Sequence, residues 1–432
     1  MRPSFHKIAI MLLLCLTTFQ TKAQLDRSTN QLIERMFEQL EQKQYFDLRR
    51  IYNSNELRLP SSYALFFGAH LDAAFNAPKE SNAKITDLLQ FPSGTIEPRD
   101  MLGLLSIKQQ NHIHLFEYKQ AWQTSKFITS TYSNMMNQTD YDNYTNTEKL
   151  WLALLNTPKQ TLEQNADVSL KLTKDKANLY RINTSFETEN ESFVFDTGAN
   201  FSVMQRSVAE KLGLEIIDTN FLTSAATGKL VQSDVAVVPE LKIGEMTIHH
   251  AVFIIFDDEQ LQFPEADYQI EGIIGFPIIR AMKEIHISQQ HTLFVPKNKT
   301  ALPTKNLALD GLFPIVEINC NDVPLAFHFD TGANITMLYP LYYKKFQKEI
   351  NKKYTAQQLE TASAGGSSKS TGFILKKTTF GVNNKSTKIK DVYLIIDGHN
   401  TTRDVYGNLG QDFFENFKGY VLNFESSCFW VE

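Results

Sequence analysis

The stretch Phe-Asp-Thr-Gly-Ala-Asn stands at residues 195–200 of this chain and recurs unchanged at residues 329–334. Each copy follows an apolar run and places one carboxylate, Asp196 or Asp330, directly before Thr-Gly. If two such turns fold against each other, the carboxylates meet, and a close carboxylate pair can share a proton and activate water. The repeat therefore predicts one catalytic site built from two halves, with Asp196 and Asp330 as its catalytic residues.

The Thr and Gly that follow each Asp could hold such a carboxylate pair in place. Thr197 and Thr331 carry hydroxyls that can donate to and accept from the opposite turn. Gly198 and Gly332 let the backbone approach closely and adopt conformations that other residues avoid. Two carboxyl groups this close cannot both be ionised without a large cost in free energy. One carboxyl therefore keeps its proton and polarises a carbonyl, while the other takes a proton from water.

The repeat extends beyond the six residues. Asp330 follows Asp196 by 134 positions, and Gly410 follows Gly275 by 135 positions. Gly275 closes the sequence Glu-Gly-Ile-Ile-Gly, and Gly410 closes Tyr-Gly-Asn-Leu-Gly. Two landmarks that keep their register over this distance indicate an internal duplication.

The segments around these landmarks also correspond. Hairpins are predicted before each turn, at residues 179–195 and 313–329, from β-rich runs separated by polar turn residues. Short helices are predicted at residues 276–282 and 411–417. Each is followed by an apolar strand, at 285–287 and at 420–422.

On these motifs, residues 166–432 resemble the retropepsin-like aspartic proteases, with two Asp-Thr-Gly-Ala lobes in one chain, as in secreted bacterial aspartyl proteases. The element Ile273-Ile274-Gly275 strengthens the resemblance, because in the family it packs around the active-site loop. The resemblance implies a mainly β, two-lobed pepsin/retropepsin-like fold with duplicated β-barrel lobes, and an aspartic endopeptidase that needs no cofactor or metal. Its substrate would be a polypeptide. Since both turns lie in one chain, a monomer with intramolecular pairing of the lobes is expected.

The chain divides into four segments on composition. Residues 1–23 predict a secretory signal peptide, with a basic lead, an apolar stretch too short to span a bilayer, and a small-residue cleavage site. Residues 24–165 predict an all-α domain, and residues 166–297 and 298–432 predict the two protease lobes. Export to the periplasm or the extracellular space follows from this division.

Apolar residues in the helical segment recur at helical spacing, and prolines are expected between the helices. Tyr118, Ala121 and Trp122 resemble the aromatic–small packing of helical-hairpin repeats, although no clear period emerges. The segment could pack on its neighbour or recruit a protein partner, and the sequence leaves both open.

Each lobe carries a candidate flap over the substrate. Ala226, Thr227 and Gly228 in the first lobe, and Gly365 and Gly366 in the second, lie between apolar strands at similar distances after the catalytic turns. Small residues suit a hairpin that closes over substrate and excludes water. An ordinary hairpin turn is the alternative for either segment alone.

Two features depart from pepsin-like enzymes. Ala199 and Ala333 stand where those enzymes usually carry Ser, so the dyad lacks a hydroxyl donor and activity nearer mild acid or neutral pH is expected. Asn408 stands where the first lobe has Ile273, and a polar group there needs a hydrogen-bond partner or solvent.

Composition and residue types limit the partners, metal sites and disulfides that the chain could have. The net charge of −5 and the lack of a long basic run give no indication of nucleic acid or an anionic membrane as partner. The adjacent His249 and His250 point to opposite faces of a strand and are not expected to bind a metal. Cys320 and Cys428 could pair in an oxidising compartment or remain free thiols.

Two other readings of the doubled motif remain. The chain could keep the protease fold and bind peptides or proteins without cleaving them. Alternatively, each lobe could pair with a lobe of another molecule.

Overall fold

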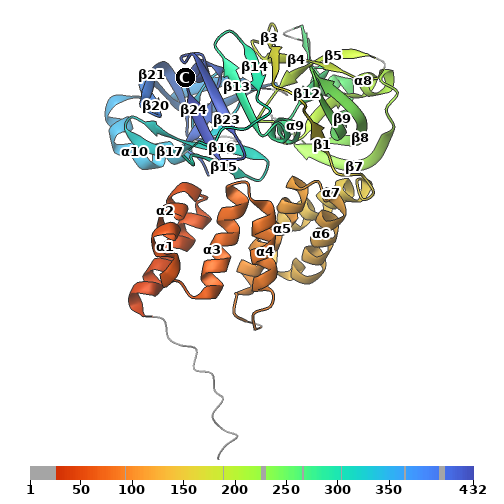
Figure 1. Cartoon of the computed structure of the whole chain (residues 1–432). Helices are drawn as coiled ribbons and strands as arrows, with labels where there is room; N and C mark the ends of the chain where they lie inside the picture. Colours follow the sequence, from red (N-terminus) through yellow and green to blue (C-terminus); the bar gives the residue numbers. More distant parts are fainter. Residues whose placement is uncertain are drawn as a thin grey trace, which may run out of the picture.

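The computed structural model describes residues 26–432 apart from 93, 188, 225–229, 265–266, 303, 364–365 and 398–403. Its N-terminal part is helical and the rest is mainly β, as predicted. The principal N-terminal helices are α1 (Arg27–Glu41), α2 (Tyr45–Asn55), α3 (Ser61–Ala74), α4 (Pro78–Leu88), α5 (Pro98–His114), α6 (Tyr118–Tyr132) and α7 (Gln138–Ala153). Figure 1 shows these helices as a row beneath the β part.

The helix boundaries follow local chemistry. The Asp26 carboxylate accepts hydrogen bonds from the first backbone N–H groups of α1 and so caps that helix. Pro78 and Pro98 were expected between helices, but they occupy the first turns of α4 and α5. Proline is well suited to that position, because the first N–H of a helix has no intrahelical partner.

The first β half forms one large, curved sheet. Its elements are β1 (Thr161–Glu163), β3 (Thr173–Lys174), β4 (Tyr180–Ser185), β5 (Asn190–Phe195), β6 (Ser202–Gln205), α8 (Arg206–Lys211), β7 (Ile216–Ser224), β8 (Leu230–Ile243), β9 (Met246–Phe256), β12 (Gly272–Ile274) and α9 (Phe276–Ala281). Strand β12 lies between β5, to which it is parallel, and β6, to which it is antiparallel. This arrangement places the Ile273–Ile274 segment directly beside the end of β5, the strand that Asp196 follows.

The second β half repeats this local pattern. Its elements are β15 (Leu307–Asp310), β16 (Phe313–Cys320), β17 (Val323–Phe329), β18 (Met337–Leu338), α10 (Pro340–Lys353), β19 (Gln357–Ser363), β20 (Gly366–Val382), β21 (Lys385–Ile395), β22 (Gly407–Leu409) and α11 (Gln411–Phe414). Strand β22 is parallel to β17 and antiparallel to β18. The predicted hairpins and short helices of both halves are therefore confirmed, with α9 and α11 ending earlier than expected.

A third sheet joins the two halves. Its order is β2 (Val168–Lys171), β14 (Thr292–Val295), β13 (Glu284–Ser288), β23 (Gly419–Asn423) and β24 (Cys428–Val431). At its centre β13 of the first half pairs antiparallel with β23 of the second. The two predicted apolar strands are thus neighbours, and their side chains contribute to one large core.

The expected β-barrels are not found. The pairings β8–β9 and β16–β20 curl each large sheet back on itself, but each strand order still ends in edge strands, β1 and β7 in one sheet and β15 and β19 in the other. Strands at such edges keep unpaired backbone groups on one side, which a closed barrel would remove.

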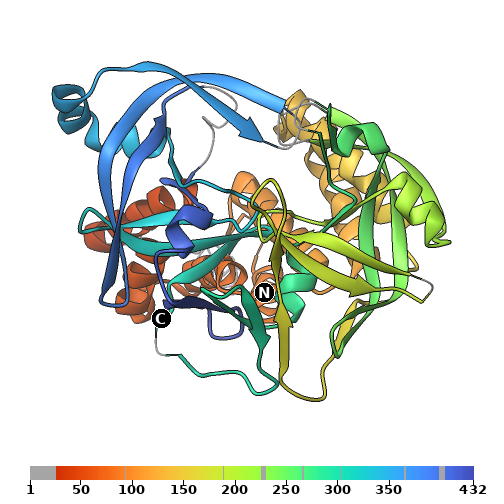
Figure 2. The ribbon, with the colours of Figure 1, turned by 90° about the horizontal axis from the view of Figure 1, so that it is seen from above.

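The helices pack against both β halves. Arg50 of α2 makes a two-pronged contact with Glu317 of β16, at 2.8 and 2.9 Å. Leu150 and Leu154, at the end of α7, share a buried cluster with Val252 of β9. Figure 2 looks down on the β part from above, and in this view the helices lie behind the strands. The helical part is thus docked along one face of the β part.

Some predictions fall outside the described residues. They are the signal segment 1–23 and the flap residues Ala226, Thr227, Gly228 and Gly365. Gly366 begins β20 and pairs with Ser363 at the end of β19. Among the helices of residues 26–432 that the structure describes, none is long and apolar enough to cross a membrane.

Candidate active site

The two Asp-Thr-Gly turns begin where β5 and β17 end. The Asp196 N–H donates to Ile274 O at 3.1 Å, and the Asp330 N–H donates to Leu409 O at 3.2 Å. Each turn is therefore fixed by the short strand beside it, β12 or β22. The backbone directs both Asp residues out of their sheets at corresponding places.

Reciprocal hydrogen bonds of the two threonines hold the turns together. The Thr197 N–H donates to Thr331 Oγ1 and the Thr331 N–H donates to Thr197 Oγ1, both at 3.0 Å. The Thr197 hydroxyl in turn donates to Phe329 O at 3.0 Å, and the Thr331 hydroxyl donates to Phe195 O at 2.9 Å. Both threonines are fully buried. Since each threonine hydroxyl both accepts a hydrogen bond from the opposite turn and donates one to the strand before that turn, the two turns are fixed relative to each other.

The two glycines leave room for the opposite carboxylate. A Cβ atom placed on Gly332 would lie 2.5 Å from the carboxylate carbon and oxygens of Asp196. A Cβ atom on Gly198 would lie 2.6 Å from Asp330 Oδ1. Any larger residue would therefore displace a carboxylate, which gives both glycines a steric role at the site.

The carboxylates of Asp196 and Asp330 lie close together, because each carboxylate sits against the glycine of the opposite turn. Backbone donors also reach them, from the Gly198 N–H to Asp196 Oδ1 at 2.7 Å and from the Gly332 N–H to Asp330 Oδ1 at 2.9 Å. Burial, and after it the neighbouring Asp330 charge, raises the pKa of Asp196 well above its usual range. The pair can therefore hold one proton near neutral pH.

Asn408 makes the pair asymmetric. Its side-chain Nδ2 donates to Asp330 Oδ2 at 3.1 Å, and its side chain is only 3% exposed. The corresponding position in the first half is the apolar Ile273. The donor favours a negative charge on Asp330, so the shared proton is better placed on Asp196. The partner that the sequence required for Asn408 is thus one of the two carboxylates.

Two hydroxyls support the site in a way that the sequence analysis did not identify. Ser202 Oγ accepts from the Gly275 N–H at 3.0 Å, and Thr336 Oγ1 accepts from the Gly410 N–H at 3.1 Å. Both follow their Asp by six positions, so the signal was the register of the repeat. They attach each turn to the glycine that follows β12 or β22.

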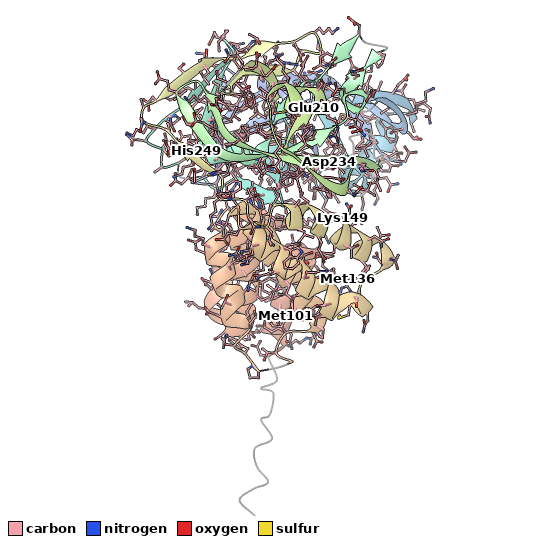
Figure 3. All side chains as sticks on the ribbon, turned by 90° about the vertical axis from the view of Figure 1, so that its right-hand side faces the viewer. Met101, Met136, Lys149, Glu210, Asp234 and His249 are labelled. Atoms are coloured by element: carbon pink, nitrogen blue, oxygen red, sulfur yellow. The ribbon has the colours of Figure 1, made fainter. Side chains whose placement is uncertain are left out.

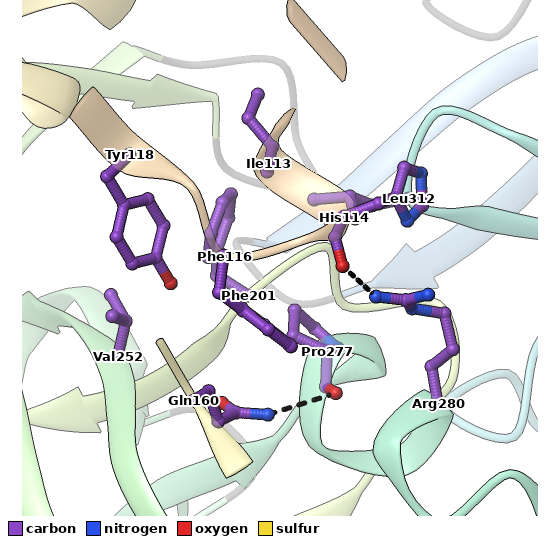
Figure 4. A pocket seen from close by; sticks show the side chains of 10 residues that line it. All are labelled: Ile113, His114, Phe116, Tyr118, Gln160, Phe201, Val252, Pro277, Arg280 and Leu312. Carbon is purple, nitrogen blue, oxygen red and sulfur yellow. Dashed lines mark hydrogen bonds between the residues drawn. The ribbon is translucent and has the colours of Figure 1, made fainter. Parts of the chain in front are cut away.

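A small cavity that is not lined by either catalytic Asp lies between the helices and the β part (Figure 4). Its lining residues are Ile113, His114, Phe116, Tyr118, Gln160, Phe201, Val252, Pro277, Arg280 and Leu312. Arg280 donates to Asn76 Oδ1 at 3.0 Å and to His114 O, and burial lowers the pKa of Arg280 to about 10. Phe201 belongs to the segment that follows the Asp196 turn, so this cavity borders that segment and is separate from the site of the carboxylates.

The two cysteines of the β part are not among the residues of the carboxylate site. Cys320 and Cys428 are free and buried, and burial raises the pKa of Cys320 to about 12 and that of Cys428 to about 11. Within the described part of the chain, no group of three or more His, Cys, Asp or Glu side chains could hold a metal ion.

Comparisons with known proteins agree with this geometry. Residues 182–278 match the family model described as "Aspartyl protease". This match supports a hydrolase of the aspartic-protease type, although it covers only the first half of the β part. No curated protein matches the chain by sequence.

Two solved structures are similar in part. A retropepsin-like aspartic protease from Rickettsia conorii is 16% identical, with a TM-score of 0.23, over 31% of this chain and 94% of that one. EIAV protease, solved with the inhibitor HBY-793, is 17% identical, with a TM-score of 0.18, over 28% of this chain and 93% of that one. Scores this low do not by themselves establish a common fold.

Proposed function

We propose that the protein is an exported aspartic endopeptidase in which Asp196 and Asp330 of one chain activate the attacking water. The observation that carries the proposal is the reciprocal bonding of Thr197 and Thr331, which holds the two Asp turns, and with them the two carboxylates, next to each other. The aspartyl protease match over residues 182–278 supports the same class of reaction.

The asymmetry at Asn408 assigns a role to each carboxylate. Asp330, stabilised as an anion by the Asn408 amide, takes a proton from water as the water oxygen attacks the peptide carbonyl carbon. Asp196 carries the proton and donates it to the carbonyl oxygen, which becomes the hydroxyl of a tetrahedral intermediate. The proton held by Asp330 then passes to the amide nitrogen as the C–N bond breaks, while Asp196 takes a proton back from a hydroxyl of the intermediate, so that a carboxylic acid and a free amine leave and the pair returns to its starting state. A pair of this kind titrates as a unit, with two apparent pKa values.

The proposal includes a duplicated, two-lobed architecture. The parallel pairing of β12 with β5 and of β22 with β17 supports it, as does the central β13–β23 pair. One chain then supplies both turns, and the active species is a monomer that binds a polypeptide in extended form along the edges of its hairpins. Secretion by residues 1–23, to the periplasm or beyond, belongs to the proposal as well.

A cleavage assay on a diverse peptide library tests this function. The mature chain should cleave internal peptide bonds, while Asp196→Asn and Asp330→Asn should each abolish cleavage and keep the fold. Asp87→Asn is the matched control, because Asp87 lies exposed on α4. Cleavage that persists in either dyad variant would refute the assignment. A folded native chain that cleaves nothing at any pH would favour a binding protein instead.

A further inference from the structure

Strand β7 lies at the edge of the first large sheet, where no strand of the described residues pairs with its outer backbone groups. Exposed edges of this kind are usually covered or interrupted in natural proteins. Here helix α7 covers it, although α7 belongs to the helical part and lies more than seventy positions earlier than its contacts on β7. Figure 3 shows Lys149 of α7 at this boundary, just below Asp234 of β8.

Asn146 of α7 bonds to this edge as a strand residue would. Its Nδ2 donates to Leu222 O at 2.7 Å, and its Oδ1 accepts from the Leu222 N–H at 2.9 Å. A primary amide offers one donor and one acceptor side by side, which matches the N–H and C=O of a single strand residue. The pair therefore fixes the position of β7 only two residues before the end of the strand.

A second contact lies one helical turn further along α7. Lys149 Nζ donates to Asn220 O at 3.0 Å. Asn220 has a φ of 48°, and it lies where the β7–β8 register shifts between Ile217 and Phe221. Such a bulge bends the strand. Lys149 thus holds β7 at the bend, and Asn146 holds the part of the strand beyond it.

The same helix also reaches the Asp196 turn. Trp151 of α7 packs on Phe201, with ring centroids 6.1 Å apart, and Phe201 lies five positions after Asp196. Trp151 is also buried in one cluster with Phe221, the neighbour of Leu222. One helix therefore contacts both the hairpin β7–β8 and the segment that carries a dyad residue.

We propose that Asn146 and Lys149 are positioning residues of the peptidase site, which hold β7 at Asn220 and Leu222 in place relative to the segment that follows the Asp196 turn. The inference rests on the proposed function and gives the helical part a lasting role in it. The sequence left open whether the helices pack on the β part or recruit a partner. In this account α7 is part of the working enzyme, and the chain without its helices would bind substrate poorly.

Steady-state kinetics on a long peptide substrate test the inference in the mature full-length protein. Asn146→Ala should lower kcat/KM by about tenfold, since two hydrogen bonds that position the hairpin are lost. The loss should appear in KM with kcat unchanged, as expected when substrate binding rather than chemistry is affected. Asn143→Ala is the matched control, because Asn143 is an exposed asparagine on the same helix.

Asn146→Asp separates hydrogen bonding from shape. Aspartate is nearly isosteric with asparagine, but at pH 7 its second oxygen would face the Leu222 carbonyl oxygen as another acceptor. Its kcat/KM should therefore be no higher than that of Asn146→Ala, while thermal unfolding shows that all variants remain folded. Hydrogen exchange at the Leu222 amide should be faster in Asn146→Ala than in Asn143→Ala, because only the alanine variant removes the acceptor of the Leu222 N–H.

The same assay distinguishes failure of the positioning role from failure of the proposed function. If the native chain cleaves the peptide and both Asn146 variants match it in KM, the positioning role is wrong and the proposed function stands. The role is also wrong if Asn143→Ala loses as much activity as Asn146→Ala. If the native chain cleaves nothing, the proposed function is wrong, and the positioning role is lost with it.

Discussion

Replacing Asn408 by leucine tests the proposed roles of the two carboxylates, in which Asp330 is the general base and Asp196 the general acid. Leucine has nearly the shape of asparagine but cannot donate the hydrogen bond from Nδ2 to Asp330 Oδ2. The opposite half of the site already has an apolar residue, Ile273, at this position. Asn408 Oδ1 is buried without a hydrogen-bond partner among the described residues, so the loss of this oxygen leaves no donor unpaired, and any loss of folding stability comes from the Nδ2 bond to Asp330.

The magnitude follows from the charge on the acceptor. A hydrogen bond to a charged group contributes about 1.5–3 kcal/mol, and one pKa unit corresponds to about 1.4 kcal/mol. The Asn408 donor stabilises the form of the pair that carries one negative charge, so it lowers the first apparent pKa. Without the donor that pKa rises, and the acidic limb of the pH–activity profile should move upward by about 1–2 pH units. The basic limb should move less, because the second ionisation removes the proton from Asp196.

The assay is kcat/KM for one peptide from pH 3 to pH 9, which reports the free enzyme's ionisations. Ile273→Leu is the control, since it alters the corresponding strand position without a polar group. An acidic limb that stays in place in Asn408→Leu would refute the assigned roles. A downward shift would indicate that Asn408 favours the neutral form instead.

Further predictions follow from the same contacts. Thr331→Val should lower the free energy of unfolding by about 2–5 kcal/mol in denaturant titrations, because it leaves the Thr197 N–H and Phe195 C=O buried without partners, whereas Thr331→Ser should retain most of the stability. Gly332→Ala should reduce kcat by about 100-fold in a folded protein, since the new Cβ displaces the Asp196 carboxylate, and unchanged kcat would contradict the steric role. Cys320 and Cys428 should resist thiol reagents in the native mature chain and react after denaturation, and an intact disulfide by mass spectrometry would contradict the free thiols.

Much of the local structure was predictable because it depends on neighbouring residues. The hairpin β16–β17 begins and ends where its turn residues indicated, and the repeated Asp-Thr-Gly located both turns. The side chain of Asn408 was identified as needing a partner, but the identity of that partner depends on the register of β22 against β17. Short patterns do not specify such pairings between distant strands.

Other features depend on tertiary contacts that no spacing rule reveals. The role of the Ser202 and Thr336 hydroxyls requires the folded turn beside β12 or β22. The pairing of Asn146 with Leu222 joins residues from different parts of the chain, and a single asparagine in a helical segment gives no signal for it. The sheets were expected to close into barrels because the resemblance to retropepsin-like proteases implied barrel lobes, yet the strand order, which decides closure, is not encoded in the repeat.

The most direct test of the central claim is a cleavage assay that compares the native chain, Asp196→Asn, Asp330→Asn and an equimolar mixture of the two variants. If both carboxylates of a site come from one chain, the native protein cleaves peptide with a specific activity that is independent of dilution, and both variants and their mixture are inactive. Activity that returns on mixing would show that the carboxylates pair between molecules, and activity in either variant alone would show that they are not the catalytic pair.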